Sequence, residues 1–263
     1  MDKKTAAWIR LGVSSVIALV LVMILIVGIS IHQYAFTSDT GGSAVSLEGQ
    51  TIHAAPGELR EIQLDWYDGT VTFVCDDQAS DITIKESSSQ SIPASKQAYC
   101  QYSDGVLTID FQRSMRFSLF RWKSYKKNLT VTIPASVCDQ EHLSMSLNSV
   151  SSLIQIQDMT VHNLTTDSVS GQVIFTGSAD TIECNTVSGD VQITSLTTPS
   201  VISADSVSAD IRIQIPANSQ FQVSHDGLSG DFTLNGLSES ESSDHHYSFD
   251  SVSGDILLSA IEN

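Results

Sequence analysis

A nine-residue pattern occurs six times in the second half of this sequence, and it constrains the fold more than any other feature. Clear copies read DSVSGQVIF at 167–175, NTVSGDVQI at 185–193 and DSVSGDILL at 250–258. The third residues of successive copies are 19, 18, 20, 21 and 24 residues apart. A period near twenty residues is typical of solenoids, in which each repeat forms one coil and buries its apolar side against its neighbours. The third residues of the six copies are Val150, Val169, Val187, Val207, Leu228 and Val252.

The apolar positions of each copy indicate how one coil is built. The third, seventh and ninth residues are apolar, and in the fourth copy they are Val207, Ile211 and Ile213. Strand residues of one parity point to the same side, so we expect all three to face the core. The fifth residue shares this parity and is Gly, Ala or Ser, which permits a tight bend or a close approach between coils. An apolar residue three positions before each copy indicates a second strand per coil.

The residues before the repeats also alternate as strands do. Residues 59–68 alternate apolar and polar side chains, and the following Asp68-Gly69 predicts a hairpin turn. A second such dipeptide, Asp104-Gly105, precedes another alternating stretch. No amphipathic helix of useful length follows Tyr34. The predicted fold class is therefore all-β.

We expect one folded head over residues 58–263, a single-handed β-solenoid or β-roll. Its lead-in at 58–142 is rich in hairpins, and six coils follow at 143–258. If successive coils stack at roughly 4.8 Å each, they form a rod about 30 Å long.

An apolar segment near the N-terminus predicts a membrane anchor. No Asp, Glu, Lys or Arg occurs in residues 11–38, and a helix at 11–34 exceeds the roughly 20 residues that span a bilayer. Three basic residues precede it and the next one after it is Arg60, so the positive-inside rule leaves residues 1–10 in the cytoplasm. Residues 35–57 then link the span to an extracytoplasmic domain of a single-pass cell-membrane protein. A cleaved signal peptide is the alternative, although its apolar region is usually about 7–15 residues.

Two alternating stretches outside the repeats, taken together with the repeats, resemble those of a known family. DGVLTID at 104–110 and LTVTIP at 129–134 precede the coils of the SVSGD type. Together they resemble the bacterial adhesin-like, or toastrack, family of β-solenoid domains, over about residues 50–260. The resemblance implies an envelope-associated domain, often membrane-anchored, that is linked to adhesion or envelope-stress sensing and has a largely unassigned function. It offers no catalytic residue to transfer to this chain.

Two copies depart from the repeat at the small fifth position. The fourth copy has Ala209 there, and the first has Ser152 followed by Leu153 in place of Gly-Asp. We expect these two coils to bend less tightly than the others.

The charge balance restricts the partners. The chain has 13 Lys plus Arg against 30 Asp plus Glu, a formal net charge of −17, which argues against binding to nucleic acid phosphates. The sixth residue of four copies is an aspartate that points outward, so stacking predicts a carboxylate ladder. A solvated ladder is the simplest interpretation, a divalent-cation site is a second, and a carbohydrate-active enzyme with paired carboxylates is a remote third. The ladder consists of Asp190, Asp210, Asp231 and Asp255.

One segment of the lead-in is strongly basic and aromatic. The sequence RSMRFSLFRWKSYKK at 113–127 holds six of the ten basic residues beyond the predicted span. It is either a strand–loop–strand extension whose aromatic residues cover the core, or a contact site for an anionic lipid, an anionic wall polymer or the acidic rod of another copy. The candidate contact residues are Arg113, Arg116, Arg121, Trp122, Lys123, Lys126 and Lys127.

Four cysteines lie on the side predicted to be exported, and an even number there permits two disulfides. We expect Cys75 to pair with Cys100 and Cys138 with Cys184. The alternative for Cys184 is a buried free thiol, because it shares the parity of Ile182.

These observations predict a protein without enzymatic activity. No Ser-His-Asp arrangement, metalloprotease helix or phosphate-binding loop is visible, and we expect no cofactor. The leading hypothesis is a membrane-anchored scaffold or sensor of the cell envelope that acts with a membrane-protein partner. The alternative is an adhesin or a module that binds wall polymer. An open strand edge near Ile256 to Leu258 also predicts head-to-head dimers through the last coil.

Overall fold

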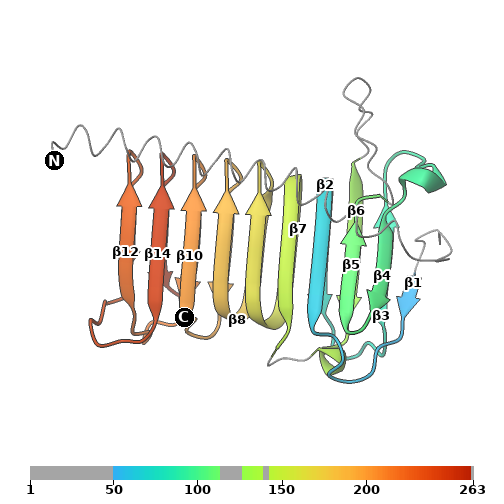
Figure 1. The fold of residues 1–263 in the computed structure, drawn as a ribbon, viewed down its shortest axis with the longest axis horizontal. Coiled ribbons are helices and arrows are strands. Elements are labelled where there is room, and N and C mark those ends of the chain that lie inside the picture. The colour runs from blue at the N-terminus through green and yellow to red at the C-terminus, as the bar shows by residue number, and fades with distance from the viewer. Residues whose placement is uncertain (1–49, 113–125, 139–141, 262–263) are drawn as a thin grey trace.

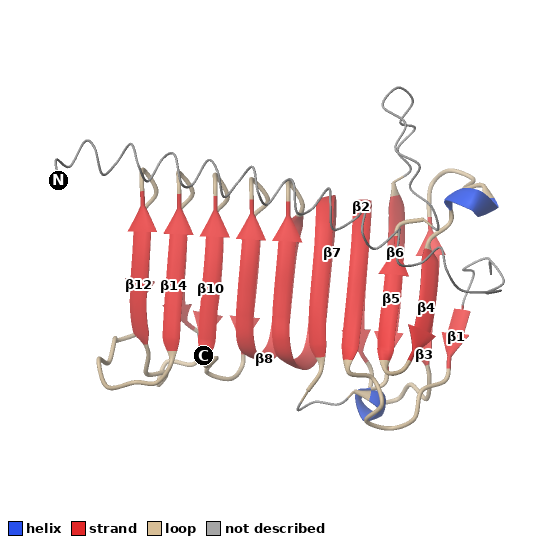
Figure 2. Cartoon of the chain, in the orientation of Figure 1, coloured by secondary structure: helices blue, strands red, loops and turns tan. Residues whose placement is uncertain are grey.

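The computed structural model describes residues 50–112, 126–138 and 142–261. In these ranges the chain forms fifteen β-strands and two short 3-10 helices, Ala94–Lys96 and Ala135–Val137, without an α-helix (Figure 2). The prediction of an all-β fold is therefore confirmed. Among the described residues no helix has the length and apolar character needed to cross a membrane, and the predicted span at 11–34 lies outside them.

The strands follow one another along the whole described chain (Figure 1). Those of the lead-in are β1 Gln50–Ile52, β2 Glu61–Cys75, β3 Ile82–Ser87, β4 Tyr99–Ser103, β5 Val106–Asp110 and β6 Lys127–Ile133. Those of the repeats are β7 Ser144–Ser168, β8 Gln172–Thr186, β9 Val191–Ser195, β10 Val201–Ser206, β11 Ile211–Ile215, β12 Gln222–Gly227, β13 Phe232–Asn235, β14 His246–Ser251 and β15 Ile256–Ala260.

The strands form two facing walls, which we call wall A and wall B. Each coil supplies one strand to wall A, turns a corner, and supplies the next strand to wall B. The long strands β2, β7 and β8 continue through such turns, so one hydrogen-bonded sheet includes both walls. Wall A runs β4, β5, β2, β7, β8, β10, β14, β12, and wall B runs β1, β3, β6, β2, β7, β8, β9, β11, β15, β13.

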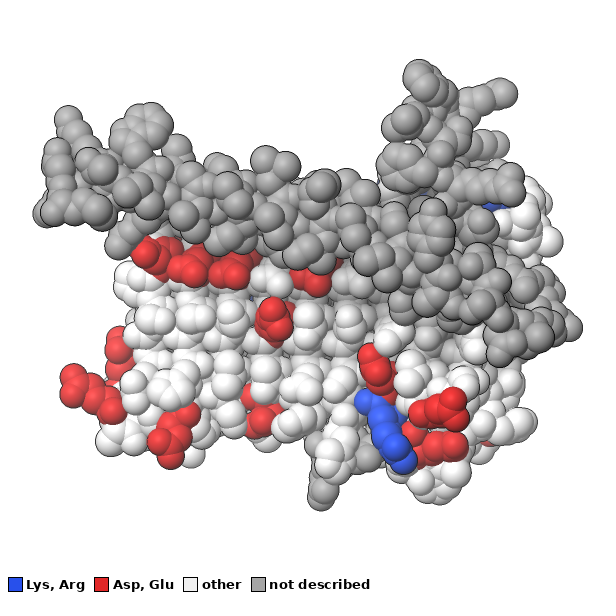
Figure 3. Space-filling view, viewed as in Figure 1, with Lys and Arg blue, Asp and Glu red and all other residues white. Residues whose placement is uncertain are grey.

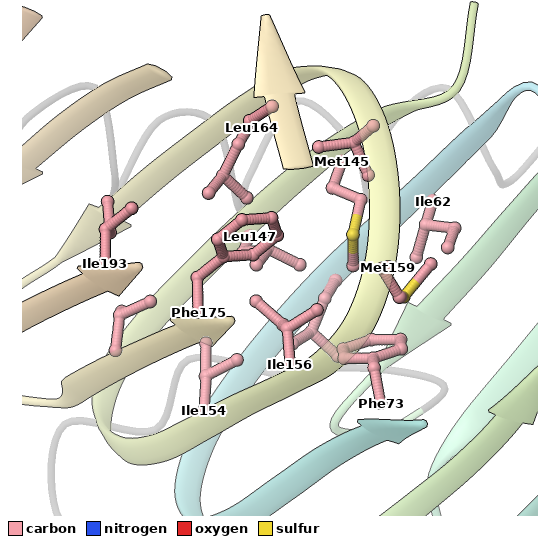
Figure 4. Close-up of a cluster of buried hydrophobic side chains, with 14 of the residues drawn as sticks. Ile62, Phe73, Met145, Leu147, Ile154, Ile156, Met159, Leu164, Phe175 and Ile193 are labelled. Atoms are coloured by element: carbon pink, nitrogen blue, oxygen red, sulfur yellow. The ribbon is translucent and has the colours of Figure 1, made fainter. Parts of the chain in front are cut away.

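The core lies between the walls and repeats from layer to layer. The predicted inward residues at the seventh and ninth positions stack in columns, with Ile154 and Ile156 in one layer and Val173 and Phe175 in the next. All four are at most 1% exposed. Figure 4 shows Ile154, Ile156 and Phe175 among the side chains of neighbouring strands, in the space that the walls enclose. Burial of this apolar surface is the main stabilising contribution that the repeats make.

In four of the six copies the corner between the walls is fixed by a serine or threonine at the second position. The Ser206 hydroxyl accepts a hydrogen bond from the Ala209 backbone N–H and donates one to the Ala209 carbonyl, both at 2.9 Å. Thr186 makes the same two bonds to Gly189. A buried hydroxyl thereby satisfies both backbone groups at the turn.

This corner corrects the predicted orientation of the third residue. Val207 was expected to face the core but is only half-buried, because Ser206 takes the inward place and the bend interrupts strand alternation. The expected loosening of the fourth coil is also wrong, because Ala209 forms the same hydrogen-bonded turn as the glycines. The first coil does differ, since β7 continues as one strand through Ser149 and Ser152, although the Ser152 N–H still donates to Ser149 Oγ at 3.2 Å.

Close stacking explains the glycines of the fifth position. A Cβ atom added at Gly189 would overlap the carbonyl oxygen of Gly171 in the preceding layer, and one at Gly254 would overlap that of Ala209. The backbones of adjacent layers must therefore approach each other closely along this column, as predicted.

Two further expectations for the lead-in need correction. Asp68-Gly69 is not a hairpin turn, because β2 continues through it from wall A to wall B. Asp104-Gly105 does join the antiparallel strands β4 and β5, and both of its residues have positive φ. Strand β1, which pairs with β3, lies inside the predicted linker at 35–57.

The coils do not stack in the order of the sequence. Strand β14 of the sixth copy pairs with β10 of the fourth on one side and with β12 of the fifth on the other. Strand β15 likewise lies between β11 and β13. The six third residues do form one column, since their backbone hydrogen bonds run 150, 169, 187, 207, 252, 228. The fifth copy therefore ends the rod, and the open edge predicted at Ile256 to Leu258 is covered.

Candidate functional site

A row of Asp and Asn side chains follows the outside of wall A, and the sequence analysis missed it. It is formed by the first residue of each copy, which lies in register from strand to strand. Figure 3 shows acidic side chains in a line over the ends of β12, β14 and β10. The sequence does contain a signal for this row, since every copy begins with Asp or Asn. The row runs Asp65, Asn148, Asp167, Asn185, Asp205, Asp250, Asp226.

Amides separate the carboxylates in the first part of this row. Asn148 Nδ2 donates to Asp65 Oδ1 at 2.8 Å, and Asn185 Nδ2 donates to Asp167 Oδ1 at 2.9 Å. Such a bond favours the ionised carboxylate, so an alternation of Asp and Asn avoids repulsion between neighbouring layers.

The last three layers have no amide between their carboxylates. Burial and the charge of Asp250 raise the pKa of Asp205 to about 6. Burial, with the charge of Asp226, also raises the pKa of Asp250 above its usual range. This end of the row is therefore an electrostatically strained surface near neutral pH.

The predicted ladder at the sixth position is present on the other side of the corner. Asp190 Oδ1 accepts the Asp210 N–H at 3.2 Å, Asp210 Oδ1 accepts the Asp255 N–H at 3.1 Å, and Asp255 Oδ1 accepts the Asp231 N–H at 3.0 Å. Three of the four carboxylates thus bridge to the next layer, and Arg212 contacts Asp210 at 3.0 Å. No group of three or more His, Cys, Asp or Glu side chains suited to a metal ion occurs in the described part of the chain.

Between the two acidic rows lies a column of aliphatic side chains, which we call the corner ridge. Its valines are half-buried and its last member, Leu228, is 46% exposed. The Ser next to each of them donates its hydroxyl to the carbonyl of the preceding layer, as Ser208 does to Val187 at 3.1 Å. The corner ridge consists of Val150, Val169, Val187, Val207, Val252 and Leu228.

The described residues that flank the basic segment lie at the same corner of the rod. Asp110, which ends β5, is in register with Asp65, and Lys127, which begins β6, is in register with Gly69. Residues 113–125, with the candidates Arg113, Arg116, Arg121, Trp122 and Lys123, lie outside the described residues.

Lys126 is exposed as predicted, but Lys127 is not a surface residue. Its side chain is fully buried, with Nζ 3.0 Å from Glu86 Oε1 and 3.9 Å from the centre of the Phe111 ring. Nζ also donates to the carbonyl oxygens of Lys96 and Phe111. Burial lowers the pKa of Lys127, and Glu86 partly opposes this effect. The base of the segment is thus fixed by a buried ion pair, and Lys127 cannot contact a ligand there.

All four cysteines are free thiols in the structure, so neither predicted disulfide is formed. Cys138 and Cys184 are buried, and burial is the main cause that raises the pKa of each thiol to about 12. Such thiols are poor nucleophiles, because the thiolate is the reactive form.

A comparison with known protein families agrees with this architecture. The profile of the family described as toastrack DUF4097 matches residues 59–263. No curated protein matches the chain.

Several solved structures are similar over most of the chain. A candidate cell adhesion protein from Clostridium sporogenes has a TM-score of 0.49 and 8% identity, over 81% of this chain and 99% of its own. A candidate adhesin from Bacteroides fragilis has a TM-score of 0.44 and 16% identity, over 82% and 98%. A candidate lipid binding protein from Parabacteroides distasonis has a TM-score of 0.40 and 12% identity, over 82% and 96%. We draw no conclusion about function from these matches, because the identities and TM-scores are low.

Proposed function

We propose that this chain, which belongs to the toastrack DUF4097 family, is a non-catalytic adhesive module of the cell envelope that binds an extended macromolecule along its rod. The observation that carries the proposal is the corner, where an aliphatic residue recurs in every layer beside an Asp or Asn of wall A, and four of these layers add an aspartate on wall B. A periodic strip of this kind suits a long or repetitive ligand rather than a small substrate, which is usually bound in a concave site.

The apolar segment at 11–34 determines where in the cell we expect this module to lie. It anchors the chain as a single span, with residues 1–10 in the cytoplasm and the β-rich domain outside the cell membrane. The rod then faces wall polymers and the exposed parts of other envelope proteins.

A scaffold or sensor of envelope conditions is the second candidate function. The raised pKa of Asp205, at about 6, favours it, because mild acidification would neutralise part of the acidic row. In this role a membrane-protein partner would respond to the change in charge.

Sedimentation of the purified full chain with isolated cell-wall fragments tests the adhesive role. We expect the wild type to co-sediment and the double variant Val187→Ser/Val207→Ser, on the corner ridge, to do so several-fold less. The control Gln155→Ser/Gln192→Ser alters the outside of wall B and should bind like the wild type.

Equal sedimentation of all three proteins, with circular dichroism showing that each is folded, would exclude the corner as the binding strip. Capture of membrane proteins from the envelope instead of wall fragments would favour the scaffold. Release of reducing sugar from wall polysaccharide would contradict a non-catalytic role.

A further inference from the structure

The only Asn-Gly dipeptide of the sequence, Asn235-Gly236, lies where strand β13 ends. Both residues are exposed, and β13 belongs to the last layer of the rod, so among the described residues it has a paired strand on one side only. Asparagine is a chemically labile residue, and a following glycine leaves the next backbone nitrogen unobstructed. Whether such a pair reacts in a folded protein depends on the hydrogen bonds of that nitrogen and on the freedom of the backbone.

The Gly236 N–H points away from the neighbouring strand. In a parallel pair, alternate residues direct both backbone groups to the same neighbour, and the Ile256 N–H donates to the Asp231 carbonyl at 2.9 Å. Asp231, Thr233 and Asn235 therefore face β15, whereas Gly236 faces the open end of the rod. Within the described ranges the Gly236 N–H donates no hydrogen bond, so this nitrogen loses none when it reacts.

Two other asparagines precede a small residue, serine in both cases, and they are held more firmly. Asn148 lies inside wall A, its Nδ2 donates a hydrogen bond at 2.8 Å, and the following Ser149 is buried. Asn218 is exposed, but the N–H of the buried Ser219 donates to the Pro216 carbonyl at 3.0 Å. The dipeptide at the end of β13 has neither constraint.

The end of β13 must open before the two groups can meet. An extended backbone holds the Gly236 nitrogen away from the Asn235 Cγ atom, so this end has to detach from β15 first. Asn235 and Ser259 form the last pair of the register, and only this pair must separate. Strand ends open at little cost in free energy, and Gly236, with a φ of 70°, keeps the conformational freedom of glycine at this point.

We propose that Asn235 is a site of spontaneous modification, at which the side-chain amide is lost through a cyclic succinimide. The Gly236 nitrogen bonds to Asn235 Cγ, the Cγ–Nδ2 bond breaks, and ammonia leaves with the proton of the Gly236 N–H. Water then opens the ring at Cγ, which gives aspartate, or at the main-chain carbonyl carbon of Asn235, which gives isoaspartate. The overall reaction consumes one water molecule and releases one ammonia molecule, without an oxidant or a cofactor.

The modification changes both the charge and the backbone of the end layer. Each product replaces a neutral amide by a carboxylate, and isoaspartate adds one carbon atom to the main chain where β13 passes into residues 236–245. This connection covers the base of β12, since the Ser240 N–H donates to the Phe221 carbonyl at 2.8 Å. The inference concerns this end of the rod and does not rest on the proposed binding role of the corner.

The test incubates the full chain in detergent micelles at mildly alkaline pH, in water enriched in oxygen-18, and maps its peptides by mass spectrometry. Ring opening incorporates one labelled oxygen, so only amides lost during the incubation are counted. We expect Asn235 to react in the folded protein within about tenfold of its rate in the urea-unfolded chain, and Asn148 to be slowed by about a hundredfold or more. Asn235→Gln should remove the labelled product of this peptide, and the matched control Asn218→Gln should retain it.

Slowing at Asn235 as strong as that at Asn148 would overturn the proposal, because the end of β13 would then be held as firmly as the inside of wall A. Equal loss at both asparagines would also overturn it, since the reaction would then follow global unfolding. The isoaspartyl product is measured by enzymatic methylation of its carboxylate. A labelled product that contains aspartate alone would refute the succinimide route, because direct hydrolysis of the amide gives no isoaspartate.

Discussion

Replacing Asp250 by Asn should stabilise the protein at neutral pH. Asp250 lies between Asp205 and Asp226 in adjacent, in-register strands, whereas Asn185 occupies the corresponding place between Asp167 and Asp205. The substitution would extend the alternation of Asp and Asn to the end of the rod. It removes two repulsive pairs and adds an amide that can donate to a neighbouring carboxylate, as Asn185 does to Asp167.

The spacing of the strands sets the size of the effect. Two unit charges about 4.8 Å apart repel by about 1 kcal/mol in bulk water and by about 3 kcal/mol at an effective dielectric constant near 20. The raised pKa of Asp205, from 3.8 to about 6, corresponds to an upper limit of about 3 kcal/mol. Because these side chains are only partly buried, solvent screens them, and we expect a gain of about 1–2 kcal/mol in the free energy of unfolding.

The gain in the free energy of unfolding from Asp250→Asn should be larger at higher pH. A carboxyl whose pKa is higher in the folded state binds protons more readily folded than unfolded, so folded-state stability falls as pH rises from about 4 to about 6. Wild type and variant should therefore differ most above pH 6 and converge near pH 4. Urea denaturation followed by circular dichroism from pH 4 to pH 8, at low salt, measures both effects.

The matched control is Asp77→Asn, which makes the same change in net charge at an exposed turn. The reverse change, Asn185→Asp, should destabilise the protein above pH 6, because it adds a carboxylate that joins Asp167 to the last three and so gives five consecutive aspartates. If Asp250→Asn were no more stable than Asp77→Asn at pH 7.5, or if its gain were equal at pH 4, the electrostatic explanation would be refuted.

Three further substitutions test the packing of the rod. Gly189→Ala should lower the free energy of unfolding by about 2–4 kcal/mol in urea denaturation, since the new Cβ overlaps the Gly171 carbonyl and the backbone must shift; an unchanged midpoint would contradict the close approach. Ser206→Ala should cost about 1–3 kcal/mol by leaving two buried backbone groups at the corner without their hydroxyl partner, and Ser206→Thr should restore most of this loss. Glu86→Ala should cost about 3–5 kcal/mol by removing the partner of the buried Lys127 ammonium, whereas the double variant with Lys127→Met should be more stable than Glu86→Ala in thermal melting.

Much of the rod can be predicted from the sequence because its information is local and repeated. The six-fold pattern predicted the layers, and the seventh and ninth residues, such as Ile211 and Ile213, are buried as their parity required. The sixth-position ladder of aspartates also follows from the period alone, although its hydrogen bonds to backbone N–H groups do not.

Predictions at turns were less successful, because the conformation at a turn depends on which strands the chain pairs with on either side of it. Asp104-Gly105 forms the expected turn between β4 and β5, but Asp68-Gly69 lies where β2 passes from one wall to the other. Lys127 was grouped with the surface bases because it follows them in sequence. Only the fold shows that strand alternation turns it inward, onto Glu86.

The period and the alternation of apolar residues determined by themselves that this chain builds stacked β-layers, since each strand must bury one side. The order of the layers was decided only by the tertiary structure, because any parallel strand offers the same backbone hydrogen bonds to any other. The coil of the sixth copy carries the bulky inward residues Tyr247 and Phe249 on β14, each 1% exposed, and it is inserted where layers cover it on both sides. The coil of the fifth copy has His225 on β12 in register with Phe249, and it forms the solvent-facing end, where a polar ring costs less.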